Sequence, residues 1–130
     1  MLFRSVTTTP AEHLAQVEHN LAVFRHLESA APAYLDWQVI CLFYAALHLV
    51  DAYIVQVTPG GTRTTTHAGR VQQVRRRLPA ISSDYVRLKT QSEGARYDLK
   101  RFSTGDVAAL FTGDFSRLRR EVQTALGLST

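Results

Sequence analysis

The chain has little cysteine and no long uninterrupted apolar run. Its single cysteine, Cys41, excludes an internal disulfide framework and most cysteine-built zinc sites, and it favours a reducing compartment. The longest uninterrupted apolar run, residues 39–47, is far shorter than the roughly 20 residues of a membrane helix. The first ten residues contain no secretory signal pattern. The sequence therefore predicts a cytoplasmic protein with no membrane segment.

Several motifs of known enzyme classes are also absent. The Gly-rich segment TPGGTRT, residues 58–64, has neither the lysine nor the preceding strand of a phosphate-binding loop. No serine nucleophile elbow is present. No alternating strand pattern or hairpin turn appears along the chain. These absences argue against a P-loop enzyme, a serine hydrolase of that type and a β-sheet domain.

Charge of one sign is in modest excess. Fifteen basic residues, of which 13 are arginine, outweigh 11 acidic ones and give a net charge of +4. The planar guanidinium group of arginine suits phosphate, which makes a nucleic acid one candidate partner. A preference for arginine over lysine can also reflect a GC-rich genome, so the charge alone does not decide between these explanations.

The apolar pattern predicts a single all-α domain over residues 1–130. An apolar content of 45% at this length is sufficient for one hydrophobic core. A helix-start signal is formed by Thr9, Pro10 and Glu12, in which Glu12 completes a capping box. Apolar spacing predicts helices at about 9–29, 36–57, 66–78, 81–94 and 106–126. Gly113 lies inside the last of these. We predict an up-and-down four-helix bundle with one additional short helix.

The helix predicted at 36–57 is apolar on most sides, but polar residues follow one line along it. A helix of this kind must be enclosed by others, so it is expected to be central. Tyr44, His48 and Asp51 are spaced four and three residues apart, and their side chains are therefore neighbours. A carboxylate beside an imidazole can orient it as a general base. The same pair, when buried, can equally be a structural hydrogen bond.

Two residues of the predicted third helix extend this candidate site. His67 and Arg70 lie about one turn apart on its inward stripe, so we expect them to reach His48 and Asp51. The predicted catalytic residues are His48, His67, Asp51 and Tyr44. The alternative interpretation is that His67 lies at the boundary of the core and Arg70 on the surface, with no role in a site. Two histidines and a carboxylate can also ligate a metal, but they lack the His-Glu-x-x-His spacing. We therefore predict no metal and no cofactor, and a metal or small-molecule enzyme stays an alternative.

Basic and aromatic side chains alternate in GARYDLKRF, residues 94–102. Such a pattern can hold phosphates and stack bases, although aromatics in an irregular connection can equally belong to the core. Basic helix faces at 70–77 and 117–120 could join the same phosphate-attracting surface. The predicted nucleic-acid contacts are Arg63, Arg70, Arg96, Tyr97, Lys100 and Arg101.

Three stretches carry a family resemblance. They read DWQVICLFYAALHLVDAYI at 36–54, THAGR at 66–70 and DYVRLKTQSEGARY at 84–97. Together they resemble small bacterial proteins of the HEPN type (higher eukaryotes and prokaryotes nucleotide-binding). The resemblance implies an up-and-down helical bundle that forms a homodimer. In many members it also implies metal-independent RNA cleavage by arginine and histidine from two protomers, in toxin–antitoxin, defence or RNA-processing systems.

One spacing departs from this family. The catalytic HEPN signature separates an arginine from a following histidine by more residues than the three between Arg63 and His67. A ribonuclease site therefore needs a shortened variant of this pair, or a set rebuilt from His48, His67, Arg70 and Arg96. The first hypothesis is a HEPN-like protein that binds RNA or a nucleotide and acts as a metal-independent endoribonuclease. The alternative is a non-catalytic interaction module that forms a homodimer or binds a partner encoded by a neighbouring gene.

Overall fold

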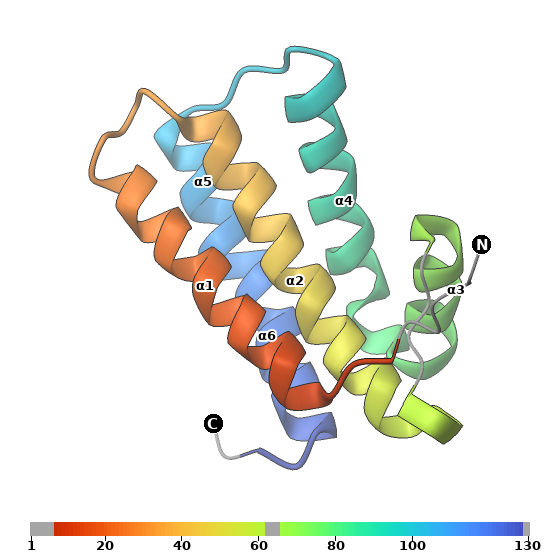
Figure 1. Ribbon diagram of the computed structural model, residues 1–130. Coiled ribbons are helices and arrows are strands. Elements are labelled where there is room, and N and C mark those ends of the chain that lie inside the picture. The colour runs from red at the N-terminus through yellow and green to blue at the C-terminus, as the bar shows by residue number, and fades with distance from the viewer. Residues whose placement is uncertain (1–6, 62–65, 129–130) are drawn as a thin grey trace, which may run out of the picture.

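The computed structural model describes residues 7–61 and 66–128, and in that part of the chain every regular element is a helix (Figure 1). The elements are α1 (Pro10–Glu28), α2 (Leu35–Val57), η1 (Pro59–Gly61), α3 (His67–Arg77), η2 (Pro79–Ile81), α4 (Ser82–Tyr97), α5 (Thr104–Ala109), η3 (Leu110–Phe115) and α6 (Ser116–Ala125). The prediction of an all-α helical bundle is confirmed.

Helix α1 begins at Pro10, where the sequence predicts it. The Thr9 hydroxyl accepts the backbone N–H of Glu12 at 3.1 Å, and the Glu12 carboxylate accepts the backbone N–H of Thr9 at 3.0 Å. These two bonds satisfy backbone donors that have no partner within the helix. The predicted capping box is therefore formed.

The last predicted helix is continuous through Gly113, but its middle is wider than an α-helix. Elements α5, η3 and α6 follow one another without a break, and the segment Leu110–Phe115 is a π-helix. A π-helical turn inserts an extra residue and shifts the phase of the side chains that follow. On either side of it, Val107 and Leu118 still face the core.

Helix α4 continues past the expected end at Gly94 and stops at Tyr97. The glycine is needed there for another reason, because the chain folds back over it. A Cβ atom at this position would lie 3.1 Å from Cδ and 3.3 Å from Cβ of Lys100. The backbone N–H of Lys100 also donates to the Gly94 carbonyl at 3.1 Å. Gly94 therefore permits the close return of the chain and does not end the helix.

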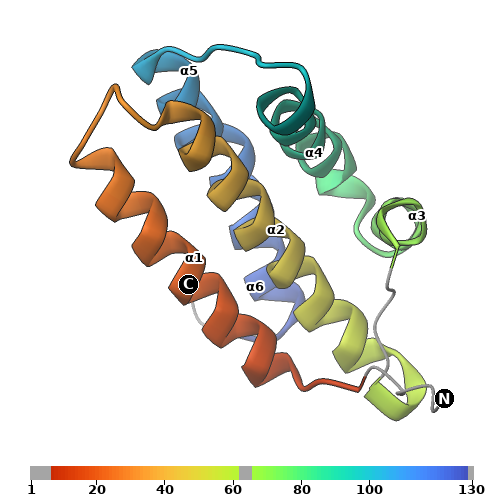
Figure 2. The ribbon, with the colours of Figure 1, turned by 45° about the horizontal axis from the view of Figure 1, so that its top comes forward.

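Helix α2 is the central element, as predicted. Fifteen of its 23 residues are buried. Figures 1 and 2 show α1 along one side of it, α4 along another, and the α5–α6 segment behind. The short α3 lies outside this group, beside the lower half of α4. The line of polar residues along α2 is partly covered, with Asp51 buried and Tyr44 and His48 half-buried.

Among the described helices, α2 alone is long and apolar enough to cross a membrane by length and composition. His48 and Asp51 interrupt the apolar run of this helix, but its mean hydropathy stays high. A search for uninterrupted apolar runs therefore does not find it. Within α2, 78% of the apolar stretch that meets this test is buried among the other helices. The core helix of a bundle has the same property.

Candidate functional site

A buried ion pair joins the central helix to α3. Nε of Arg70 donates to Oδ1 of Asp51 at 2.7 Å, and its Nη2 donates to Oδ2 at 3.3 Å. Asp51 is 0% exposed and Arg70 is 3% exposed. Burial by itself would lower the pKa of Arg70, but the hydrogen bond and charge of Asp51 outweigh it and raise that pKa. The expectation that Arg70 turns inward and reaches Asp51 is confirmed.

This pair changes the role expected of Asp51. The sequence places Asp51 beside His48, as the group that would orient a general base. In the structure the carboxylate directs both oxygens at the Arg70 guanidinium, a bidentate geometry that gives strong, charge-assisted hydrogen bonds. Asp51 therefore fits the structural interpretation, with a partner different from the one expected. Arg70 leaves the predicted set of RNA contacts, because it is buried.

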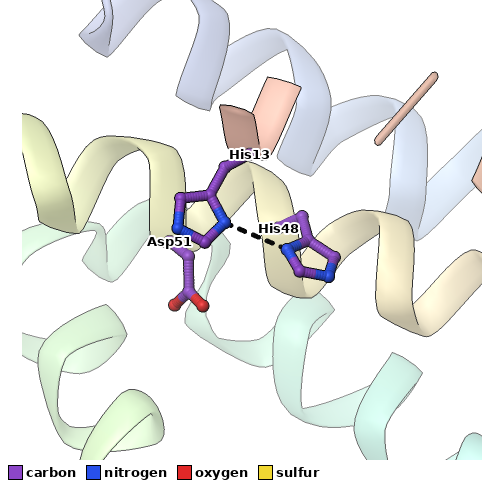
Figure 3. Close-up of side chains that lie close together, drawn as sticks. All are labelled: His13, His48 and Asp51. Atoms are coloured by element: carbon purple, nitrogen blue, oxygen red, sulfur yellow. Dashed lines mark hydrogen bonds between the residues drawn. The ribbon is translucent and has the colours of Figure 1, made fainter. Parts of the chain in front are cut away.

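His48 pairs with a second histidine, His13 of α1. Their Nδ1 atoms lie 3.0 Å apart, and their rings are stacked with centroids 5.3 Å apart (Figure 3). Nε2 of His13 lies 2.6 Å from the Thr8 hydroxyl. His13 is 4% exposed, whereas His48 is half-buried. The two histidines and Asp51 form a group whose metal-ligating atoms all lie within 4.8 Å of one another.

Sequence reasoning missed His13, although a signal for it exists. Position 13 precedes Val17, Leu21 and Phe24 by helical spacings, and all three are buried. A histidine in line with such a stripe must enter the interior and find a polar partner there. The pairing with α2 becomes visible only once α1 is docked.

A cluster of basic and aromatic side chains, some half-buried and some exposed, lies between α2 and α4. The Nη1 of Arg96 donates to the Tyr44 hydroxyl at 3.1 Å and to the Tyr97 hydroxyl at 3.3 Å. Its guanidinium carbon lies 5.6 Å from the centre of the Tyr44 ring and 4.9 Å from that of Tyr97. Both distances are within the range of cation–π contacts. Tyr97 is 71% exposed, so the interpretation of this aromatic as a core residue is wrong.

His67 stands at the start of α3, near this cluster. Its ring contacts Phe43 with centroids 5.9 Å apart, and the side chain is otherwise exposed. Partial burial lowers the pKa of His67, and the positive charges of Arg70, Lys89 and Arg96 lower it further. We name Tyr44, His67, Arg96 and Tyr97 the tyrosine–arginine cluster.

The remaining predicted residues lie elsewhere. Arg63 lies outside the described residues. Lys100 hydrogen-bonds the Gln91 side chain and sits 5.5 Å from the centre of the Phe102 ring. Lys100 and Arg101 line a groove of about 450 Å³ between the start of α2 and the end of α4. Both are exposed, and no contact joins them to the tyrosine–arginine cluster among the interactions of the described residues.

Removing one partner of the buried pair should destabilise the fold. The substitution Arg70→Ala leaves the Asp51 carboxylate buried without its main cation, so the free energy of unfolding should fall by about 3–5 kcal/mol. The double variant Asp51→Leu/Arg70→Met removes both charges and should recover most of that loss. Urea unfolding followed by circular dichroism measures both. The exposed Arg75→Ala serves as a control and should change stability by less than about 0.5 kcal/mol. A near-neutral Arg70→Ala would contradict the burial of this pair.

The pKa of His67 should reflect the positive charges that surround it. Its imidazole should titrate below the ordinary value of 6.5, because burial and nearby cations disfavour the protonated form. As the pH falls, the unfolded chain takes up this proton first, so the group lowers stability below about pH 6.5 and contributes nothing above it. Arg96→Gln should move the midpoint upward, and Arg76→Gln should not. NMR titration of the ring protons measures each midpoint, and an unshifted His67 would contradict this electrostatic picture.

Comparison with known proteins adds no functional assignment. The chain matches no protein-family model, and no curated protein or solved structure matches it significantly.

Proposed function

We propose that the protein is a HEPN-like RNA-binding protein whose contact site is the tyrosine–arginine cluster. The observation that carries the proposal is the position of Arg96, which bonds the hydroxyls of Tyr44 and Tyr97 and lies close to both rings. A guanidinium held in this way offers further N–H donors to a phosphate. The exposed Tyr97 ring offers a face on which a base can stack.

The charges around the cluster support an anionic ligand. His67 lies within the influence of three cations, Arg70, Lys89 and Arg96. Two acidic residues counter two of them: Asp51 pairs with Arg70 at 2.7 Å, and the Glu93 carboxylate is bound by Lys89 at 3.1 Å. Arg96 is therefore the cation of this group whose charge is directed at the tyrosine–arginine cluster. A surface with this balance attracts phosphate groups. Single-stranded RNA combines the phosphate and the exposed base that such a surface suits.

Metal-independent cleavage is part of the proposal, as the HEPN resemblance implies. His67, with its lowered pKa, is neutral at pH 7 and is able to accept the proton of a 2′-hydroxyl. The 2′-oxygen attacks phosphorus, and Arg96 supplies a positive charge for the phosphorane that forms. The bond to the 5′-oxygen then breaks, that oxygen takes the proton back from the His67 imidazolium, and a 2′,3′-cyclic phosphate remains. The toxin–antitoxin or defence setting rests on the resemblance alone.

Binding to a fluorescently labelled single-stranded RNA at low salt tests the proposal. Tyr97→Ala should weaken binding by roughly five- to hundred-fold, because a stacked base contributes about 1–3 kcal/mol. Arg96→Gln should weaken binding and flatten its dependence on salt. Arg120→Gln, an exposed arginine of α6, is the matched control for charge. The RNA-binding proposal fails if the unsubstituted protein does not bind at low salt, or if Arg96→Gln and Arg120→Gln weaken binding equally.

The same samples, kept with EDTA, measure cleavage. His67→Ala should abolish RNA cleavage while binding persists, and the exposed His26→Ala should leave both unchanged. Binding without cleavage in the unsubstituted protein would reject the nuclease role and leave the binding role standing.

The alternative function, a non-catalytic interaction module that forms a homodimer, has an observation of its own. Trp37 is 54% exposed and Tyr34 is 49% exposed at the start of α2. Their sequence neighbours line one groove together with residues 99–102, which follow α4; these neighbours are Pro32, Ala33, Leu35 and Asp36. Large apolar side chains exposed at one end of a bundle are typical of a contact surface.

Sedimentation of the purified protein tests this alternative. A homodimer that uses this surface should dissociate at least about tenfold more readily after Trp37→Ser, a loss of roughly 1.4 kcal/mol. Tyr53→Ser, a half-buried tyrosine at the other end of α2, is the comparison variant. A protein that stays monomeric at all concentrations would reject the homodimer.

A further inference from the structure

We propose that His13, His48 and Asp51 form a binding site for a divalent transition metal such as Zn²⁺. Their ligating atoms come from α1 and α2 and lie within 4.8 Å of one another (Figure 3). This site is separate from the tyrosine–arginine cluster and does not depend on RNA binding. The sequence alone predicts no metal, because its candidate histidines lack the His-Glu-x-x-His spacing. His13, which lies 35 residues before His48, is not among those candidates.

The two imidazoles already stand close to the geometry of metal ligands. Zinc binds histidine nitrogen at about 2.0–2.1 Å in a tetrahedral arrangement, which places two such nitrogens about 3.3 Å apart. The Nδ1 atoms of His13 and His48 are 3.0 Å apart. A metal between them needs the rings to separate by a few tenths of an ångström and to turn until both Nδ1 lone pairs point at the ion.

Thr8 holds the His13 ring in a suitable orientation. Its hydroxyl lies 2.6 Å from Nε2 of His13, and Nδ1 of the same ring faces His48. When the hydroxyl accepts the Nε2 proton, Nδ1 carries a lone pair and is ready to coordinate. Metal-bound histidines usually hold their second ring nitrogen in a hydrogen bond of this kind. In that tautomer His48 donates its Nδ1 proton to His13, and this proton must move to Nε2 of His48 before Nδ1 coordinates.

Asp51 supplies the third ligand and the negative charge. Its carboxylate points away from the imidazoles toward Arg70 (Figure 3), so one oxygen must turn back toward them to reach a tetrahedral position. Oδ2 is the oxygen held less closely, at 3.3 Å from Arg70, against 2.7 Å for Oδ1. Each carboxylate oxygen has two lone-pair positions, which allows Arg70 to keep Oδ1 while Oδ2 coordinates.

The ligand set indicates the class of metal. Two imidazoles and one carboxylate suit zinc, cobalt, nickel or copper, whereas magnesium and calcium prefer oxygen ligands alone. His48 is half-buried, which leaves the site open to solvent on one side. Three protein ligands and a position for water are the arrangement that zinc adopts in catalytic sites.

Cobalt titration of the full chain, after treatment with EDTA, tests the site. One Co²⁺ per chain should bind and produce the visible absorption of a tetrahedral complex. His13→Gln and His48→Gln should each weaken binding by more than about 100-fold, and Thr8→Val by about 10- to 100-fold. His19→Gln and His26→Gln, two exposed histidines of α1, should bind as the unsubstituted protein does.

A measurement without substitutions guards against misfolded variants. On addition of Zn²⁺, the imidazole ¹⁵N signals of His13 and His48 should shift, while those of His19 and His26 stay in place. Zinc should also raise the melting temperature of the unsubstituted protein. The proposal is overturned if no cobalt spectrum appears, if zinc shifts only the exposed histidines, or if folded His48→Gln binds cobalt as tightly as the unsubstituted protein.

Discussion

The arrangement of this protein's polar sites depends on the buried ion pair between Asp51 and Arg70. Helix α3 lies outside the main bundle and buries only Arg70 and Val74 within its own length. The bond to Asp51 therefore holds the helix to α2 and sets the position of His67 at its first turn. Two charges removed from water stabilise a fold only when each satisfies the other. The bidentate contact meets that condition, and it fixes the position of α3 against the core.

One line along α2 serves two different sites because different helices cover its two sides. Toward α1, His48 contacts His13, and the two imidazoles lie in a largely buried setting. Toward α4, Tyr44 meets Arg96 at the protein surface. The first site offers lone pairs and suits a cation, whereas the second offers N–H donors and suits an anion. The two proposals made for this protein follow from that division.

Much of the fold could be predicted from local patterns. The capping box at Thr9 and the apolar spacing along α2 depend on residues a few positions apart, and both predictions hold. Boundaries set by distant contacts were harder to predict. Glycine is a common stop signal and predicts the end of a helix at Gly94, but the structure uses this glycine to admit the returning Lys100 side chain.

The sequence by itself determined that Tyr44, His48 and Asp51 share one line, because helical spacing follows from backbone geometry. It also indicated that Arg70 faces inward. Only the tertiary structure decided the partners of these groups: Asp51 with Arg70, His48 with His13, and Tyr44 with Arg96. These pairs join residues 19 to 52 positions apart. No local propensity encodes such a pairing, since it depends on how the helices pack around α2 and on the need to satisfy each polar group that this packing buries.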